Sequence, residues 1–480
     1  MSFMSFMRQA VIAASIAISS AAVTARGQTL SDPFLATDLV TQGLNVAPES
    51  LVTAIVFIDA GTALLADRES GRVHRLTLDA ATMIGPGPVV LDLDVVSSGY
   101  ANQSEYGVQA MELHPQFAAN GQVYIRYDKS PVPGSDTPQA DVVLGGNFSA
   151  SIPTLNVIER FVWDPAGNGG VGELIFDALI HTAMVDTRYH HGGPIEFLPD
   201  GTMCVVYGDL RRVSNFGWMA QTAGALLSVN NPDGVVEDHG TIIRLNDDGS
   251  VPADNPFVGA ISIHYTPRWL AYGIRNSFGM AVDPASGTLW FADNGPSVFD
   301  EINRVSPGDN GGWKVILGPA APGSTDALVM LPGASYGDPA FSWLDAIGVT
   351  GMHFLHGSAL GPAYDDLLLV GCVNDGHLWG FRLDADRECF VFESPALQDL
   401  VDDRANPLED PPGPDGAEIV FGLGFGAGPS MGVLAIERGA DGLPYLLTAG
   451  GKLYRIRPWD VLDMIGTPGV RRLLVLLGGW

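Results

Sequence analysis

The sequence predicts an all-β protein, a six-bladed β-propeller with irregular loops between its blades. Short apolar runs recur in groups of three along the chain, and turn-forming residues separate the runs. The chain of 480 residues contains 59 glycines and 33 prolines, a content that favours many turns over long helices. Six small sheets arranged radially leave only short, protected edges, so a propeller is the expected closed form.

The three apolar runs of each blade are expected to be its successive strands. In chain order the six units are Leu51–Phe57, Ala63–Ala66 and Val73–Leu76; Val108–Leu113, Val123–Tyr127 and Asn156–Val162; Pro194–Phe197, Met203–Tyr207 and Thr241–Leu245; Gly279–Val282, Thr288–Ala292 and Glu301–Val305; Gly351–Phe354, Leu367–Gly371 and His377–Leu383; and Val433–Ile436, Pro444–Thr448 and Lys452–Ile456.

The turn between the first two strands of a unit usually carries glycine after a polar or small residue. Asn120-Gly121, Asp200-Gly201, Ser286-Gly287 and Asp441-Gly442 are examples. Glycine adopts the positive φ that such hairpins need. A propeller interpretation also needs no low-complexity linkers, whereas an array of β-sandwiches would need two or more.

The ends of the chain are expected to lie outside the propeller. Arg8 precedes an apolar stretch over Ala10–Val23, and small residues at positions 23 and 25 suit signal peptidase. The stretch is shorter than the roughly 20 residues that span a bilayer. We therefore expect a signal peptide over residues 1–25, one propeller domain over 26–458 and a C-terminal tail over 459–480, without a membrane span in the mature chain.

The charge of the chain excludes a nucleic-acid partner. The formal net charge is −29, with three lysines, Lys129, Lys314 and Lys452. Binding to a phosphate backbone needs clustered cations, which this sequence lacks. The turn-rich segments Pro131–Pro153, Gly318–Pro339 and Ala396–Met431 are interpreted as surface loops between blades, with a lid as the alternative.

Three cysteines cannot all pair with one another. Cys204 lies in an apolar strand pattern and is expected to be a small buried hydrophobe. Cys372 and Cys389 flank neighbouring predicted strands, so one disulfide between them is compatible with an oxidising compartment, and the sequence leaves this pairing open.

The segment Tyr272–Trp313 carries the most chemistry. It places an Arg-Asn pair, two strands and an acidic, carbonyl-rich loop in succession. Gly295 and Pro296 can offer main-chain oxygens there, while Asp293, Asp300 and Glu301 supply charge, which suits a hard cation such as Ca²⁺. A β-hairpin with a solvated acidic turn is the alternative interpretation, because the same residue types populate ordinary turns.

The order of these pieces resembles the soluble sugar dehydrogenases that depend on pyrroloquinoline quinone (PQQ), the glucose/sorbosone dehydrogenase family of six-bladed propellers. The matching motifs are Arg275-Asn276, Gly295-Pro296, Asp300-Glu301-Ile302-Asn303 and Gly312-Trp313, together with a second block of His190-His191-Gly192-Gly193, Pro199-Asp200-Gly201 and Gly208-Asp209. The resemblance runs from about residue 45 to about residue 458. It implies a periplasmic or secreted oxidoreductase with PQQ and Ca²⁺ as cofactors, a sugar substrate and an electron acceptor of unknown identity.

The resemblance also implies roles for individual residues. His190, ten residues before the Asp of PDG, is the expected general base, and Arg275 is the cation that stabilises charge on the cofactor. Glu105, Arg275, Asn276 and Trp343 are the expected cofactor-binding residues. Carbonyls of Gly295 and Pro296 are expected to hold one Ca²⁺, and Glu301 with the Gly311 carbonyl a second.

Three positions depart from the family pattern. Asn374 stands where the glucose enzymes carry lysine, and Gly432 and Leu434 stand where they carry arginine. These cations would meet the carboxylates of PQQ, so their loss would weaken PQQ binding unless Arg438, Arg404 or a loop residue substitutes. Two alternatives follow: a non-catalytic secreted binding propeller that has lost its PQQ ligands, and a Ca²⁺-dependent hydrolase of the lactonase type.

Overall fold

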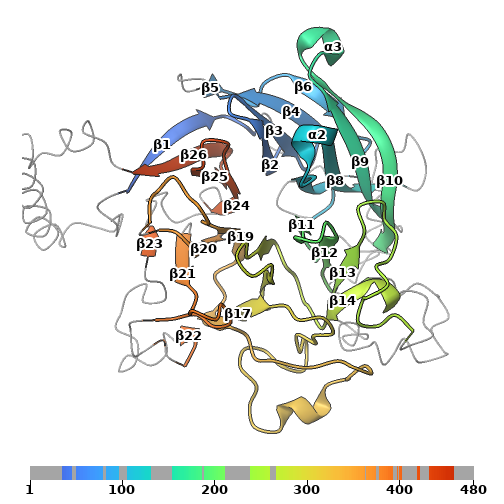
Figure 1. The fold of residues 1–480 in the computed structure, drawn as a ribbon, viewed down its shortest axis with the longest axis vertical. Helices are drawn as coiled ribbons and strands as arrows, with labels where there is room; N and C mark the ends of the chain where they lie inside the picture. The colour runs from blue at the N-terminus through green and yellow to red at the C-terminus, as the bar shows by residue number, and fades with distance from the viewer. Residues whose placement is uncertain are drawn as a thin grey trace, which may run out of the picture.

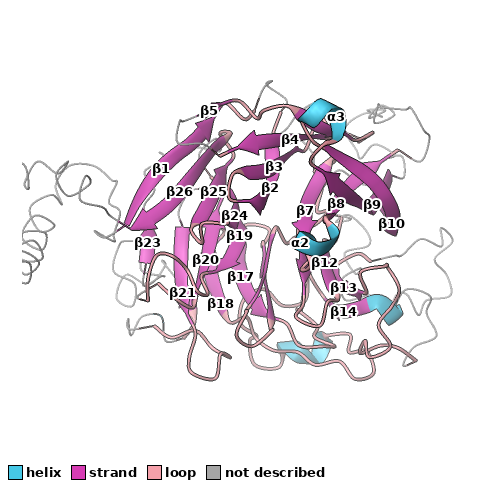
Figure 2. Cartoon of the chain, turned by 45° about the horizontal axis from the view of Figure 1, so that its top comes forward, coloured by secondary structure: helices cyan, strands magenta, loops and turns pink. Residues whose placement is uncertain are grey.

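A computed structural model of the chain places its described residues in six sheets around a common centre (Figure 1). The structure describes residues 35–45, 50–78, 83–96, 105–130, 154–185, 189–210, 238–259, 266–362, 364–374, 378–392, 397, 399–402, 419–421 and 432–458. Strands dominate this part of the chain, and its few helices are single turns (Figure 2). The predicted all-β six-bladed propeller is confirmed.

The elements have the following bounds. The strands are β1 (Leu35–Gln42), β2 (Val52–Asp59), β3 (Thr62–Asp67), β4 (Arg72–Thr77), β5 (Met83–Ile84), β6 (Val89–Asp92), β7 (Val108–Leu113), β8 (Gln122–Lys129), β9 (Thr154–Asp164), β10 (Glu173–Val185), β11 (Ile195–Phe197), β12 (Met203–Tyr207), β13 (Thr241–Leu245), β14 (Trp269–Tyr272), β15 (Gly279–Val282), β16 (Leu289–Asp293), β17 (Val298–Arg304), β18 (Phe341–Asp345), β19 (Val349–Phe354), β20 (Leu367–Cys372), β21 (Leu378–Arg382), β22 (Val401–Asp402), β23 (Ile419–Phe421), β24 (Val433–Arg438), β25 (Pro444–Thr448) and β26 (Lys452–Pro458). The short helical turns are α2 (Phe117–Asn120), α3 (Gly167–Gly170), η1 (Thr266–Arg268) and η2 (Ser324–Ala327).

Each sheet is one blade. Blade 1 has the order β2-β3-β4-β6, blade 2 β7-β8-β9-β10, blade 3 β11-β12-β13-β14, blade 4 β15-β16-β17-β18-β22, blade 5 β19-β20-β21-β23, and blade 6 β24-β25-β26-β1-β5. The first strand of each blade contacts the first strand of the next, so β2, β7, β11, β15, β19 and β24 surround the central axis. Every predicted run falls on one of the first three strands of a blade.

The fourth strand of each blade was not predicted from the sequence. These strands are β6, β10, β14, β18, β23 and β1, and they lie outermost in their blades or beside a short added strand. The long strands β9 and β10 extend past the rest of blade 2 to α3 (Figure 1). Exposure differs among these strands: Ile175, Phe176 and Leu179 of β10 are each about half exposed, whereas β14 and most of β18 are buried. Strands such as β14 and β18 are separated from the third strand of their blade by a long irregular segment, so no hairpin pattern marks them in the sequence.

The ring is closed by the two ends of the described chain. Strand β1 pairs antiparallel with β26, from Leu35 opposite Pro458 to Gln42 opposite Lys452. Asp38 of β1 accepts hydrogen bonds from the guanidinium groups of Arg455 and Arg457, each at 2.8 Å. Burial opposes ionisation of Asp38, but these two cations lower its pKa. Blade 6 thus joins the N-terminal strand to the last blade through backbone pairing and charge.

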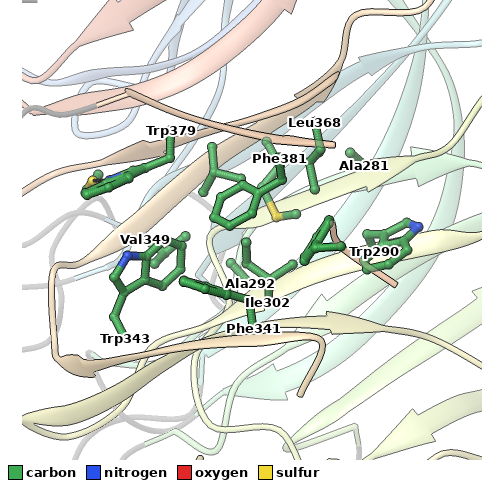
Figure 3. Close-up of a cluster of buried hydrophobic side chains, with 14 of the residues drawn as sticks. Ala281, Trp290, Ala292, Ile302, Phe341, Trp343, Val349, Leu368, Trp379 and Phe381 are labelled. Atoms are coloured by element: carbon green, nitrogen blue, oxygen red, sulfur yellow. Dashed lines mark hydrogen bonds between the residues drawn. The ribbon is translucent and has the colours of Figure 1, made fainter. Parts of the chain in front are cut away.

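Aromatic side chains fill the space between blades 4 and 5 (Figure 3). Phe341 and Trp343 of β18 pack edge-to-face at 4.9 Å between ring centroids, and Trp343 also contacts Trp379 and Phe381. Trp343 is only 1% exposed. It is therefore a core residue, and the expectation that it binds cofactor or lines a site wall does not agree with its position. The apolar burial of large rings explains its presence there.

The three cysteines are free. Cys372 is fully buried in β20, where its sulfur accepts a hydrogen bond from the indole Nε1 of Trp379, whereas Cys389 is exposed beyond β21. The disulfide between Cys372 and Cys389, which the sequence left open, is therefore absent. Cys204 is fully buried in β12, as expected, and burial raises its pKa.

Several predicted segments fall partly or wholly outside the described residues. These are the signal peptide over 1–25, the tail over 459–480, the loop Pro131–Pro153 and most of Ala396–Met431. The loop Gly318–Pro339 is described and consists of turns around η2. Within the described part of the chain no helix is long and apolar enough to cross a membrane.

One buried carboxylate ties blade 2 to blade 3. Asp238 is fully buried and accepts hydrogen bonds from Nε2 of His181 on β10 at 3.2 Å, Nε of Arg268 at 2.6 Å and Nε1 of Trp269 on β14 at 3.0 Å. Burial raises its pKa, but the hydrogen bond from His181 and the charge of Arg268 outweigh burial and lower it to about 2. The ionised form of Asp238 is therefore stabilised by folding.

We predict that this carboxylate makes the fold acid-sensitive between about pH 4 and pH 2. Because the folded pKa lies below the unfolded value, the stabilisation is complete above the unfolded pKa and is lost as pH falls through the folded pKa. It amounts to roughly 2–3 kcal/mol. Urea unfolding of the wild type and of Asp238→Asn across this range checks the prediction: the difference in free energy of unfolding should shrink as pH falls, and a constant difference contradicts it.

Candidate active site

A central cleft runs along the propeller axis. Its volume is about 730 Å³, and the first strands of all six blades line it, for example at Thr53, Gln109, Ile195, Met280 and Thr350. Four carboxyl groups also face it, from Glu105, Glu112, Glu196 and Glu437. Such a cleft is the usual position for a ligand in a fold of this kind.

His190 lies on the segment between β10 and β11. Its neighbours Tyr189, Gly192 and Gly193 line this cleft, while His190 itself is not among the lining residues. Its ring Nδ1 is 2.5 Å from Oδ1 of Asp209, a residue that follows β12. The backbone of His190 has a positive φ of 59°, which is uncommon for a residue other than glycine. Two hydrogen bonds hold the turn: the Leu210 amide donates to the His190 carbonyl at 3.3 Å, and the Asp209 amide donates to the Arg275 carbonyl at 2.7 Å.

Gly208 allows this close approach of two distant segments. A Cβ atom at position 208 would lie 2.3 Å from the carbonyl oxygen of His190 and 2.8 Å from that of Arg275. No side chain fits there. His190 and Arg275 are thus brought to the same place from blades 3 and 4, as the resemblance implies.

The guanidinium of Arg275 is held by one carbonyl and one ring. Its Nη1 donates to the Asn294 carbonyl at 2.5 Å, and its Cζ lies 5.3 Å from the centre of the Trp313 ring. The main-chain amides of Arg275 and Asn276 both donate to Asp293, at 2.9 and 2.7 Å. Burial raises the pKa of Asp293 to about 6 although these two amides favour its charge. Asp293 therefore fixes the backbone of the Arg-Asn pair.

A contact between Asn276 and Glu105, which lines the cleft, connects the Arg275–Asn276 pair to the cleft. Nδ2 of Asn276 is 3.4 Å from one carboxylate oxygen of Glu105, and the other oxygen accepts the His191 amide at 2.9 Å. Oδ1 of Asn276 is buried and has no hydrogen-bond partner within the described residues. A buried amide oxygen without a partner calls for a donor or a cation from a ligand.

The expected metal residues fall into two groups. A small cavity of about 10 Å³ is lined by Gly295, Glu301 and Gly311, together with Arg275 and Asp293. It has room for one water molecule or an ion of similar size. Pro296 is exposed on the turn and is not among the lining residues. Asp300 accepts the Gly295 and Gly348 amides at 2.9 and 2.6 Å, so it shapes the loop.

Of the two carboxyl groups that line this cavity, Glu301 has the more strongly raised pKa. It accepts the Gly318 amide at 2.7 Å and Nδ2 of Asn303 at 3.2 Å. Burial, with the charge of Asp293 added, raises its pKa to about 8. Among the residues described, no group of three or more His, Cys, Asp or Glu side chains is placed to hold a metal ion. A cation at this cavity would therefore depend largely on main-chain oxygens.

A buried guanidinium supports the whole His190 segment. Arg126 of β8 is fully buried and donates to the carbonyls of His191 at 2.6 Å, Gly193 at 2.8 Å and Val206 at 2.6 Å. It also donates to Oδ1 of Asn156 and lies 4.1 Å from the Tyr207 ring centre. Arg126 thus joins blade 2 to the backbone of blade 3.

Asp128, two residues further along β8, continues this network. Its carboxylate is fully buried and is bonded by Nδ1 of His191, Nε2 of Gln109 and Nδ2 of Asn156 at 2.9, 2.5 and 2.9 Å. The sequence alone did not indicate a role for Arg126 or Asp128, because single charged residues inside the strand pattern of β8 match no motif. Asp209 and Trp313 were part of quoted motifs, but no role was assigned to them.

We predict that Arg126→Lys destabilises the protein by about 2–4 kcal/mol, because an ammonium cannot reproduce the planar fork and at least one buried carbonyl loses its partner. Denaturant unfolding measures this change. The matched control is Arg160→Lys on the neighbouring strand, where the partly exposed pair with Asp177 should matter by less than about 1 kcal/mol. Equal effects of the two substitutions would contradict the assigned role.

Two of the three positions that depart from the family pattern, Asn374 and Leu434, line the cleft, and Gly432 is not among the lining residues. A Cβ atom at Gly432 would lie 2.2 Å from the Val373 carbonyl oxygen, so no cation fits at that position. Arg438 donates to the His356 and Gly357 carbonyls on an exposed turn and does not line the cleft, which is contrary to the idea that it replaces a missing cation. Arg404 lies outside the described residues. Arg68 is a guanidinium residue that does line the cleft.

These features define a propeller with a histidine–carboxylate pair, an anchored arginine and an acid-lined axial cleft. Residues 50–417 match the Glucose / Sorbosone dehydrogenase family, and the chain belongs to this family. The aldose sugar dehydrogenase YliI of Escherichia coli is 31% identical over 209 residues, which are 42% of this chain and 50% of that protein. The quinoprotein glucose dehydrogenase B of Acinetobacter calcoaceticus is 26% identical over 53% of this chain and 48% of that protein.

The chain spans about half to three fifths of the length of such curated relatives; an uncharacterized protein of Synechocystis is matched over 61% of its length. Solved structures share the fold over more of the chain. The soluble aldose sugar dehydrogenase of Escherichia coli, solved in its apo-form, has a TM-score of 0.57 at 19% identity and covers 88% of this chain and all of that one. The PQQ-bound aldose sugar dehydrogenase of Streptomyces coelicolor has a TM-score of 0.56 at 18% identity, with 90% and 100% covered.

Proposed function

We propose that this protein is an oxidoreductase that oxidises an aldose or related sugar alcohol by hydride transfer to PQQ, with His190 as general base and Ca²⁺ assisting. The observation that carries the proposal is the meeting of the His190–Asp209 pair with Arg275 and Asn276 beside the axial cleft. Family membership and the PQQ-bound form of the structural neighbour from Streptomyces coelicolor support the same chemistry.

His190 is suited to take a proton from a substrate hydroxyl. Its Nδ1 donates to the carboxylate of Asp209, which leaves the lone pair of Nε2 to accept the proton. The carboxylate then stabilises the imidazolium that forms and keeps the ring oriented. A sugar hydroxyl is a weak acid, so a fixed base beside the reacting carbon is the main requirement that this chain itself must meet.

The residues at the reacting end of the site fit PQQ. The guanidinium of Arg275 can pair with an anionic oxygen, and the unpartnered Oδ1 of Asn276 can accept a donor or contact a cation. When bound, PQQ supplies the two-electron acceptor for the hydride of the sugar. Ca²⁺ would be held by main-chain oxygens near Gly295, with a second ion near Glu301 and the Gly311 carbonyl, where both residues line the small cavity.

The far end of the cleft fits a tricarboxylate less well. Asn374, Gly432 and Leu434 supply no charge. Arg68 is a guanidinium residue that lines the cleft, and it is paired with Glu69 at 3.4 Å. The carboxyl groups of the cleft are partly neutralised: burial raises the pKa of Glu112 to about 8, and burial together with the other two glutamates raises that of Glu196. These raised pKa values lower the negative charge that Glu112 and Glu196 contribute to the cleft, which reduces repulsion of an anionic cofactor. We therefore propose that PQQ binds, but more weakly than where all three cations are present.

Export completes the proposal. The first 25 residues have the pattern of a signal peptide, and we propose a periplasmic or secreted location with a small-molecule sugar substrate and a separate electron acceptor. The missing cations at positions 374, 432 and 434 favour a second candidate, a binding propeller without catalysis. The hydrolase alternative needs several side-chain ligands around one metal, and the described residues offer no such group.

We predict that His190→Gln lowers kcat for PQQ- and Ca²⁺-dependent aldose oxidation by at least about 100-fold, because glutamine cannot accept the proton. Reduction of an artificial electron acceptor measures the rate. The control is His356→Gln, a half-exposed histidine on an outer turn of blade 5, which should leave the rate unchanged. Full activity of the His190 variant would refute its role as base, and a wild type that neither binds PQQ nor turns over would favour the binding-propeller candidate.

We predict that Asn374→Lys tightens PQQ binding by about tenfold or more, because a charge-assisted hydrogen bond contributes about 1.5–3 kcal/mol. Asn374 is exposed to the cleft, so a longer side chain has room there. Absorbance titration with PQQ measures affinity, and Asn374→Gln is the neutral control. Equal affinities for the two variants would mean that no cofactor carboxylate lies near position 374.

A further inference from the structure

We propose that Trp313 is a positioning residue that holds the two charged parts of the site, the Asp209–His190 pair and the Arg275 guanidinium, in one fixed arrangement. The reaction it serves is the one under Proposed function, but the structural role can be measured without turnover. Trp313 comes from the loop after blade 4's third strand, and neither contact was expected from its motif.

The first contact is a hydrogen bond to the carboxylate. Indole Nε1 of Trp313 donates to Oδ2 of Asp209 at 2.7 Å, while Oδ1 of the same carboxylate is bonded to His190 at 2.5 Å. The indole N–H is only a donor, so its partner must be an acceptor such as a carboxylate. Donors at both oxygens fix the plane of the carboxylate, and the carboxylate in turn fixes the His190 ring.

The second contact is with the guanidinium. Cζ of Arg275 lies 5.3 Å from the centre of the Trp313 ring, within the range of a cation–π interaction. The opposite side of the group is tied by the 2.5 Å hydrogen bond to the Asn294 carbonyl. One indole therefore contacts both an anion and a cation that belong to different blades.

The backbone under Trp313 is well anchored, which allows its side chain to act as a fixed point. The Trp313 amide donates to the Gly273 carbonyl at 3.0 Å, and the Gly311 amide donates to the Tyr272 carbonyl at 2.7 Å. The Gly312 amide donates to Oδ1 of Asn310 at 3.0 Å. These bonds join the loop to the end of β14, directly before Arg275. The distance between the indole and Arg275 is thus set by short-range geometry.

The test separates the two contacts with two variants. Trp313→Phe keeps an aromatic ring beneath Arg275 but removes the N–H donor, and Trp313→Leu removes both. Trp290→Phe is the matched control: Trp290 belongs to the same blade, is fully buried, and its Nε1 has no hydrogen-bond partner among the described residues. Thermal unfolding of each variant checks that it is folded.

The first readout needs neither cofactor nor substrate. In the apo-protein, the proton of the short His190 Nδ1–Asp209 hydrogen bond should give a far-downfield ¹H NMR signal, assigned by its loss in His190→Gln. We expect Trp313→Phe to move this signal upfield or broaden it, because the carboxylate is no longer held from both sides, whereas Trp290→Phe leaves it in place. An unchanged signal in Trp313→Phe would overturn the proposal.

The second readout is kinetic. With PQQ and Ca²⁺, Trp313→Phe should lower kcat by about tenfold with KM for the sugar within about twofold, and Trp313→Leu should lower kcat further, to about 100-fold. Equal kcat values for wild type and both variants also overturn the proposal. If the wild type shows no turnover but the NMR signal responds as expected, the proposed function fails while the positioning role of Trp313 stands.

Discussion

The guanidinium of Arg126 crosses from blade 2 into the backbone of blade 3, and the arrangement of the site follows from that contact. Three main-chain carbonyls, including those of His191 and Gly193, receive its hydrogen bonds in a fully buried position. Carbonyls in that position cannot reach water, so they need a protein donor. The planar fork of arginine meets several of them at once. The hydrogen bonds of Arg126 therefore fix the segment that carries His190 in the protein without a ligand.

A chain of further contacts extends this order across the axis. The carboxylate of Asp128 is hydrogen-bonded to the His191 ring, and the His191 amide donates to Glu105. Glu105 in turn accepts a hydrogen bond from Asn276, which precedes the first strand of blade 4. Trp313 and Asp209 make a second connection between blades 3 and 4. His190 and Arg275 are therefore held by two sets of contacts: one runs through Asp128, Glu105 and Asn276, and the other through Asp209 and Trp313. The two sets share few residues. Such redundancy suits a site whose parts must hold their positions to a fraction of an ångström.

The acidity of the protein has a local counterpart in the cleft. Glu112, Glu196 and Glu437 face the axis at corresponding places on their first strands, and burial raises the pKa of each. A raised pKa favours the neutral form of each carboxyl group, so the cleft repels anions less than the net charge of −29 suggests. The same cleft lacks the cations that the family pattern places at positions 374, 432 and 434. Affinity for an anionic cofactor is thus the property in which we expect this chain to differ most from the pattern it resembles.

The first three strands of every blade could be predicted from the sequence because they are buried and flanked by turn glycines. The motif order grouped His190, Arg275, Asn276 and Glu105 as one site, and hydrogen bonds link their segments in the structure, while their roles stay a prediction. The outer strands could not, since several of them, such as β14 and β18, follow a long irregular segment and are not joined to the third strand of their blade by a hairpin turn. Trp343 and Pro296 show the limit for single residues: a tryptophan reads alike in a core and in a site wall, and a carbonyl's direction depends on the whole loop.

The sequence by itself determined the repeat, the strand-and-turn alternation and the residue types of the site, because these follow from local apolar period and turn chemistry. Only the tertiary structure decided which groups meet. Arg126, Asp128, Asp209 and Trp313 act through contacts between blades, and hydrogen-bond geometry between segments far apart in the chain leaves no mark on local sequence pattern.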